Sequence, residues 1–183
     1  MRILLISLAM LLANSAVAQK TMGDALKGMP DSLMPYLSHN NRLDCIDFSE
    51  ANMKAEVRNA LEGKSELLQL TNSYALFRMN DASTVEFCLL DDDNLQLVCM
   101  IQTYGTDLCE STIAFYTTSW KPLATQKYLP IACEGFAANY DAAQKMLTLE
   151  NSGFLNRVAM EDQKEEKKVQ IKLKWLDGCF KES

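Results

Sequence analysis

The stretch from Thr84 to Trp120, TVEFCLLDDDNLQLVCMIQTYGTDLCESTIAFYTTSW, constrains the fold more than any other part of this chain. Apolar residues alternate along it, and two short polar segments rich in Asp, Asn and Gly interrupt the pattern. Such alternation is typical of β-strands, and those polar residue types favour turns. The stretch therefore predicts three successive antiparallel strands, at Thr84–Leu90, Leu95–Tyr104 and Glu110–Ser119.

Side-chain parity predicts the register of these strands, because successive residues of a strand point to opposite faces. The apolar face of the first strand comprises Val85, Phe87 and Leu89, that of the second Leu95, Leu97, Cys99 and Ile101, and that of the third Ile113 and Phe115. Joining the first two faces requires a loop with an odd number of residues, which Asp92–Asn94 provides. In this register Cys88 and Cys99 point to opposite faces and cannot form a disulfide.

The first 18 residues have the pattern of a secretory signal. The basic start Met1-Arg2 precedes the apolar run Ile3–Leu12, and small residues lead to a cleavage position before Gln19. The alternative is a transmembrane anchor, for which the apolar run is too short. We therefore expect an exported mature chain, periplasmic or extracellular. No cysteine follows the cleavage position, so we expect no lipid anchor.

Removal of 18 residues from 183 leaves 165, which is enough chain for a single domain over residues 19–183. The full chain carries 18 Lys and Arg against 24 Asp and Glu, a net charge of −6. An acidic chain repels phosphate backbones, so nucleic acid is not an expected partner. No later stretch is long and apolar enough to span a membrane, so we do not expect an integral membrane protein.

The mature chain has six cysteines: Cys45, Cys88, Cys99, Cys109, Cys133 and Cys179. An even number in an exported chain allows up to three disulfides, with Cys99–Cys109 a candidate across the second turn. The alternative is that several are small buried apolar residues. The sequence has no CxxC pair, so nothing in it indicates a thioredoxin-like redox centre.

Helical spacing predicts several helices before the strands. The expected helices are Thr21–Lys27, one beginning at Met29–Leu37, Asn41–Phe48 with a cap at Ser38 or Asn40, and Asn52–Glu62. The last shows the clearest pattern, because Met53, Val57, Ala60 and Leu61 form a stripe that Gly63 ends.

Alternation predicts further strands on both sides of the central three. They are Leu67–Leu70, Tyr74–Met79, Lys145–Glu150 and Val169–Trp175, whereas Phe154–Met160 fits strand or helix, Glu161–Lys168 is a charged connection and Leu123–Asn139 is irregular. The sequence shows no internal repeat and no linker of the kind that separates domains.

Three phrases of the sequence carry a resemblance to a known family. They are MPDSLMPYLSHNNRLDCIDF at Met29–Phe48, followed by CMIQTYGTDLCES and IAFYTTSWKPL within Cys99–Leu123. Together they resemble an uncharacterised exported family of Gram-negative anaerobic bacteria, known as a domain of unknown function. The resemblance implies export and a single domain, and it implies no activity or site residues.

Catalytic and metal-binding patterns are sparse. The one histidine, His39, has a single local nucleophile, Cys45, six residues away, whereas a Ser or Cys nucleophile usually needs a base held beside it. The alternative for His39 is an exposed residue near a helix cap. One His and scattered cysteines do not predict a zinc site, and HExxH, GxSxG and phosphate-binding glycine loops do not occur. We therefore expect no metal and no cofactor.

Two acidic clusters and three aromatic residues are the remaining candidates. Asp91–Asn94 could bind calcium, but it lacks the loop and closing Glu of an EF-hand, so an ordinary hairpin turn is favoured. Asp44 and Asp47, with Glu50, could supply paired carboxylates for a glycosidase, or a solvated helix face with local ion pairs beside Arg42. The aromatic residues at strand ends could line an interface or cap the core, and they are Tyr104, Tyr116 and Trp120.

The sequence thus predicts an α+β fold in which N-terminal helices pack on one antiparallel meander sheet of about six to eight strands. The leading functional hypothesis is a non-catalytic exported binding or protein-interaction module of the cell envelope, with an envelope protein or a glycan as partner. The alternatives are a carboxylate-dependent hydrolase of envelope or dietary polymers, and a calcium-dependent module.

Overall fold

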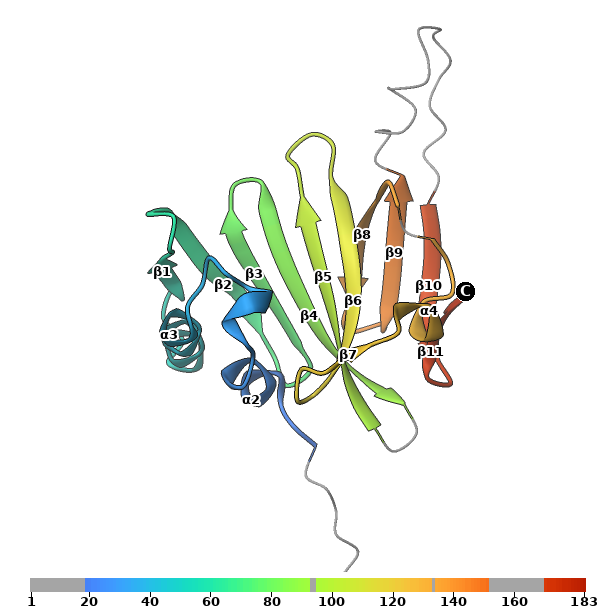
Figure 1. The fold of residues 1–183 in the computed structure, drawn as a ribbon, viewed down its shortest axis with the longest axis horizontal. Coiled ribbons are helices and arrows are strands. Elements are labelled where there is room, and N and C mark those ends of the chain that lie inside the picture. The colour runs from blue at the N-terminus through green and yellow to red at the C-terminus, as the bar shows by residue number, and fades with distance from the viewer. Residues whose placement is uncertain (1–18, 93–94, 133, 152–169) are drawn as a thin grey trace, which may run out of the picture.

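The three central strands form the middle of a larger antiparallel sheet, hereafter sheet A. The computed structural model describes residues 19–92, 95–132, 134–151 and 170–183, and all structural statements concern these. Sheet A has seven strands paired in chain order: β1 (Glu56–Arg58), β2 (Lys64–Leu70), β3 (Tyr74–Asn80), β4 (Ser83–Asp92), β5 (Leu95–Tyr104), β6 (Glu110–Thr117) and β7 (Pro122–Leu123). Sheet A confirms the predicted antiparallel meander (Figure 1).

A second antiparallel sheet, sheet B, was not predicted. Its four strands are β8 (Phe136–Asp141), β9 (Met146–Asn151), β10 (Gln170–Leu176) and β11 (Cys179–Glu182), in the order β11-β10-β9-β8. The helices are α2 (Met22–Lys27), the 3-10 turn η2 (Asp31–Leu33), α3 (His39–Glu50) and α4 (Thr125–Tyr128). The α+β class is confirmed, with the strands divided between two sheets rather than one.

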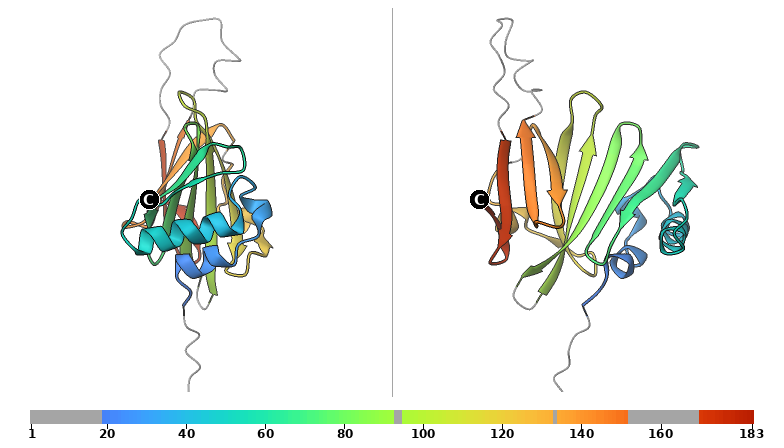
Figure 2. Two further views of the ribbon diagram at one scale, coloured as in Figure 1. Left: turned by 90° about the vertical axis from the view of Figure 1, so that its left-hand side faces the viewer. Right: turned by 180° about the vertical axis from the view of Figure 1, so that it is seen from behind.

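Sheet A is covered on both faces (Figures 1 and 2). Helices α2 and α3 pack on one face around Phe77 and Phe87, and sheet B packs on the other face around Phe115 and Leu147. Each face therefore has its own hydrophobic cluster, and β4 and β5 contribute side chains to both. This arrangement buries every residue of Val85–Leu90 in β4 and of Leu97–Ile101 in β5.

The predicted register of β4 and β5 is wrong. Asp92 pairs with Leu95, so the connection has two residues rather than three, and Cys88 lies directly opposite Cys99. Both cysteines belong to the cluster that faces sheet B. Parity failed here because both faces of these strands are apolar, so burial on one face does not select the register. The register of β5 and β6 is as predicted, with Cys99 opposite Phe115 and Ile101 opposite Ile113.

The helix predicted at Asn52–Glu62 is wrong as well. Within it lies β1, whose Val57 pairs with Ser65 of β2. Met53 and Leu61, taken as core positions of the stripe, are 60% and 65% exposed. Pairing with the edge of β2 outweighs the local helical preference of this segment.

The predictions for the other helices are mostly correct. Helix α2 begins after Thr21, whose hydroxyl accepts a hydrogen bond from the amide of Asp24. Helix α3 begins after Ser38, which caps the amide of Asn41 in the same way. The helix expected from Met29–Leu37 is limited to η2, with irregular chain around it.

A fully buried arginine organises that irregular segment. The Arg42 guanidinium donates hydrogen bonds to the carbonyls of Leu37 and Met29 and to Asp31 Oδ1, the last at 2.8 Å. A buried cation is stable only when such acceptors surround it. Arg42 therefore fixes the backbone conformation of this segment, which forms little regular helix.

Long-range hydrogen bonds join the N-terminal helix to sheet A. The indole nitrogen of Trp120 donates to the carbonyl of Ala25 at 2.8 Å, and Trp120 packs edge-on against Phe87. The amide of Met22 donates to Asn72 in the β2–β3 turn at 2.8 Å. Helix α2 is thus placed by residues far along the chain.

Several predictions on the C-terminal half are refined. The irregular region at Leu123–Asn139 contains α4 and the start of β8, and Pro122 begins the edge strand β7. The alternating face of Val169–Trp175 is confirmed in β10, where Leu173 and Trp175 are buried. Strand β10 does not lie at the rim of sheet B, because β11 lies beyond it.

Some predicted features lie outside the described residues. They are the signal sequence at 1–18, Asp93 and Asn94 of the first turn, Cys133, Phe154–Met160 and Glu161–Lys168.

A cross-linking experiment tests the β4–β5 register. We expect Asp91→Cys with Gln96→Cys to form a disulfide under mild oxidation, since the two residues lie directly opposite one another. Asp91→Cys with Leu95→Cys, which a three-residue loop would place opposite, should form little. Peptide mass spectrometry distinguishes these bridges from any made by the native cysteines, and the reverse result would restore the three-residue loop.

Candidate functional site

The junction between the two sheets contains most of the buried polar groups on the sheet B side of the molecule. The edge of β8 that faces away from β9 lies against sheet A, and side chains of sheet A accept hydrogen bonds from its amides. Ser111 Oγ accepts from Ala138 N at 2.8 Å, and Glu86 Oε2 accepts from Tyr140 N at 3.4 Å. At the start of β8, Glu110 Oε1 accepts from Gly135 N at 3.2 Å. These bonds satisfy backbone groups that burial would otherwise leave without partners.

Glu86 is the buried carboxyl group of this junction. It is 4% exposed, and its Oε2 also accepts a hydrogen bond from the Tyr74 hydroxyl at 2.7 Å. Burial raises the pKa of Glu86, while the bonds from Tyr74 and Tyr140 partly oppose that change. Burial also raises the pKa of the Tyr74 hydroxyl, so Tyr74 remains a neutral donor. These bonds explain Glu86 as a structural acceptor.

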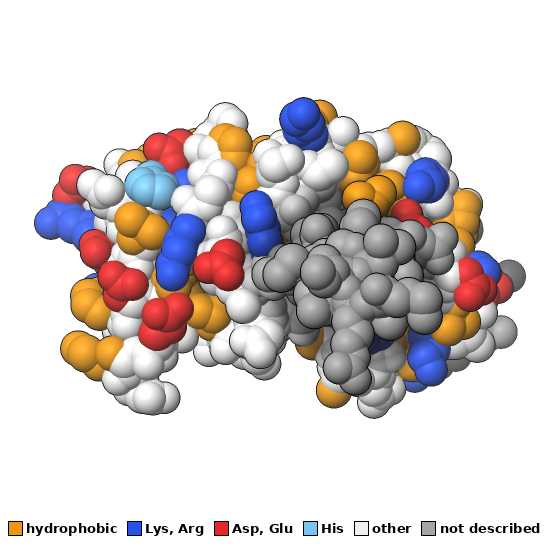
Figure 3. Space-filling view, turned by 90° about the horizontal axis from the view of Figure 1, so that it is seen from below, with side chains coloured by type: hydrophobic (Ala, Val, Ile, Leu, Met, Phe, Trp, Pro, Cys, Tyr) orange, Lys and Arg blue, Asp and Glu red, His pale blue; other side chains and the backbone are white. Residues whose placement is uncertain are grey.

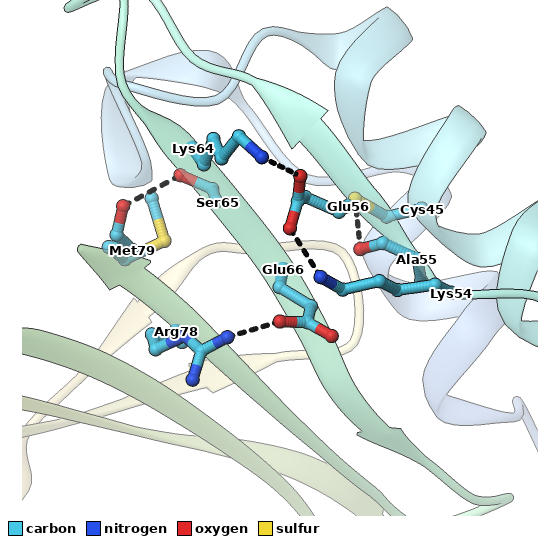
Figure 4. Close-up of polar contacts among 9 residues, drawn as sticks. All are labelled: Cys45, Lys54, Ala55, Glu56, Lys64, Ser65, Glu66, Arg78 and Met79. Atoms are coloured by element: carbon cyan, nitrogen blue, oxygen red, sulfur yellow. Dashed lines mark hydrogen bonds and ion pairs between the residues drawn. The ribbon is translucent and has the colours of Figure 1, made fainter. Parts of the chain in front are cut away.

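The predicted nucleophile and base do not come together. His39 is exposed at the start of α3, on the surface seen in Figure 3. Cys45 is fully buried, and its thiol donates to the carbonyl of Ala55 (Figure 4). Burial raises the pKa of the Cys45 thiol to about 11, which disfavours the reactive thiolate.

The acidic clusters lie apart from each other. Asp44, Asp47 and Glu50 are exposed on α3, which packs on β1 and β2. Asp92 is paired with Lys127 of α4 at 3.3 Å, and Asp91 with Lys145 at 3.8 Å. The α3 carboxylates therefore lie on a solvated helix face, where Glu50 pairs with Lys27.

Metal binding is also not indicated. Among the described residues, no three His, Cys, Asp or Glu side chains lie close enough together to hold a metal ion. Since the calcium hypothesis includes Asp93 and Asn94, which are not described, it stays a prediction.

The predicted aromatic residues divide between core and surface. Trp120 is buried, and Tyr116 packs against it with ring centroids 5.7 Å apart, so both cap the core on the helix side. Tyr104 is 48% exposed at the end of β5. Cys109, in the loop that follows, donates its thiol to the carbonyls of Gly105 and Thr106. It is a free thiol, so the candidate bridge to Cys99 is wrong.

Charged side chains cover the outer face of β1–β3 (Figure 4). Glu56 lies between Lys54 and Lys64, each at 2.6 Å, and Glu66 pairs with Arg78. Hydrogen bonds from the two lysines lower the pKa of Glu56 to about 2. Acidic and basic side chains are interspersed over much of the surface in Figure 3. A short, charged edge strand of this kind discourages edge-to-edge association.

A mainly apolar groove lies beside β6. The groove has a volume of about 520 Å³ and lies between β6 and the segment that joins α4 to β8. Its apolar lining comprises Ile113, Leu129, Pro130, Ile131 and Ala132, and its polar lining comprises Thr125, Gln126 and Glu134. A recess of this size, mainly apolar with a few polar groups, is typical of binding sites.

The chain also matches a described family. Residues 14–180 match the family model described as "Protein of unknown function (DUF3256)". The chain belongs to this family. The match covers most of the sequence, including the central strands, the groove and the inter-sheet junction. No curated protein matches the sequence.

A solved structure shares the fold. It is described as "Structure of a domain of an uncharacterized protein from Porphyromonas gingivalis W83", with 17% sequence identity to this chain and a TM-score of 0.74. The similarity covers 91% of this chain and 99% of that chain. At this identity the likeness establishes the fold alone. None of the described helices is long and apolar enough to cross a membrane.

Sequence reasoning missed both Glu86 and the groove. Glu86 had a signal, since it is the one charged residue in the otherwise apolar run Val85–Leu90. No signal in the sequence indicated the groove, because one of its walls is an irregular segment. Only the fold places that segment beside Ile113.

Substitution of Glu86 should separate its role as an acceptor from its charge. Glu86→Ala leaves Tyr74 Oη and Tyr140 N without their acceptor, and we expect a loss of ~2–4 kcal/mol in the free energy of unfolding. Glu86→Gln keeps an acceptor oxygen and should lose less. Urea unfolding measures both, with Asp44→Ala on the exposed face of α3 as the control.

The same variants predict a pH dependence. Because the pKa of Glu86 is raised in the folded state above the ordinary value of 4.5, its ionisation costs stability. The protonated Glu86 side chain contributes stability when the pH is below its ordinary pKa. That contribution is lost as the pH rises through the raised pKa of the folded state. As the pH rises through this range, the free energy of unfolding of Glu86→Gln should therefore increase relative to that of the wild type. A constant difference across it would contradict a raised pKa.

Proposed function

We propose that this protein is a non-catalytic binding module of the cell envelope, acting on a partner protein after export. The groove between β6 and the α4–β8 segment carries this proposal. It is open and mainly apolar. Such a surface favours recognition by burial of apolar groups over chemistry on a bound substrate.

Export is the second part of the proposal. The pattern of residues 1–18 supports it, and the mature protein would work in the periplasm or outside the cell without a lipid anchor. Mass spectrometry of the protein recovered from its natural host should find an N-terminus at Gln19. Recovery of an intact N-terminus from the cytoplasm would contradict export.

Site-specific photo-crosslinking in the natural host tests the binding function. A photoreactive residue in place of Gln126 or Pro130, both exposed in the groove, should capture one and the same identified envelope protein. The same group in place of Asp44, which is exposed on α3, is the control and should not capture that envelope protein. Equal capture at all three positions, or none at any, would contradict a binding groove.

A further inference from the structure

One residue of the unpaired part of the β6 edge, Ile113, lines this groove, while Ser111 binds Ala138 of β8. Strand β7 has two residues, and its pairs with β6 are Phe115 with Leu123 and Tyr116 with Pro122. After Leu123 the chain leaves the sheet and enters α4. Within the described residues, no strand pairs with this edge of β6 from Glu110 to Ala114.

The backbone of Ile113 points toward the groove. On the β7 side of β6, the amide of Thr117 donates to the carbonyl of Lys121 at 2.9 Å, and Phe115 faces Leu123. Alternate residues of a strand direct their N–H and C=O groups to the same side. The N–H and C=O of Ile113 therefore point to the side that β7 occupies further along, and Ile113 itself lines the groove.

The groove favours an occupant with an apolar and a basic part. The lining supplies apolar contacts from Leu129, which is almost fully buried, and from its neighbours in the following segment. Glu134 is exposed at the far end of that segment. The basic residue of α4, Lys127, pairs with Asp92 and lies over the ring of Tyr128. Charge complementarity at Glu134 therefore calls for a cationic group.

We propose that the groove takes an extended peptide segment of a partner protein, which adds a short strand to β6 at Ile113 and places a Lys or Arg beside Glu134. This inference rests on the proposed binding function and names the chemistry of its partner. Strand addition supplies main-chain hydrogen bonds, and the apolar lining receives alternate side chains of the peptide. The α4–β8 segment would then cover the added strand from the other side.

Peptide binding measured together with amide exchange tests the inference. The probes are short synthetic peptides in which Val and Thr alternate, with Lys, Ser or Glu at one end. We expect the Lys peptides to bind most tightly and to slow hydrogen exchange at the Ile113 amide, as seen by NMR. Glu134→Lys should weaken their binding about tenfold. The matched charge reversal Asp44→Lys, on exposed α3, should leave it unchanged.

Each other result has a distinct meaning. Peptides that bind without protecting Ile113, or equally well to Glu134→Lys, would overturn strand addition. A partner captured at Gln126 and Pro130 with no peptide binding would overturn the peptide class while the binding function stands. Capture of a second copy of this chain would overturn the proposed binding of a partner's peptide and would indicate self-association instead. Failure of both peptide binding and crosslinking would overturn the inference and the binding function together.

Discussion

Side-chain oxygens of sheet A accept hydrogen bonds from the edge of β8, and the packing of the two sheets depends on this. An edge strand set against the face of another sheet has amides that no ladder satisfies. Ser111 and Glu86 meet that requirement for Ala138 and Tyr140. Because these acceptors sit on β6 and β4, they fix where β8 lies on sheet A. The position of the groove follows, since β8 determines where the segment after α4 must end.

The success of sequence reasoning varied with how many faces of an element are buried. Strand β10 has one buried face, and its alternation was read correctly. Strands β4 and β5 are buried on both faces, so parity gave the wrong register and the wrong orientation for Cys88 relative to Cys99. The α+β class, the antiparallel meander and the capped helices could be predicted because local features encode them. The hydroxyl of Ser38, which caps a helix, is one such feature. Sheet B was missed in part because β8 lies within a region that showed no clear period.

The candidate site was harder to predict than the fold. The groove depends on Ile113 and Leu129 meeting across a loop, and no local pattern encodes that contact. The segment Asn52–Glu62 shows the same limit, because an available strand edge on β2 decided its structure. In each case a partner distant along the chain or on another element outweighed local preference.

The bond between Trp120 and Ala25 has a consequence for how the chain acquires its structure. The two residues are 95 positions apart, so α2 leaves the ribosome long before the residue that holds it in place. At the usual speed of synthesis the interval is roughly 5–20 s. During that time the carbonyl of Ala25 in α2 lacks the indole nitrogen of Trp120 that binds it in the folded molecule. The first part of the folded molecule to be made is therefore among the last to be secured, and a factor that shields this segment during synthesis would act in that interval.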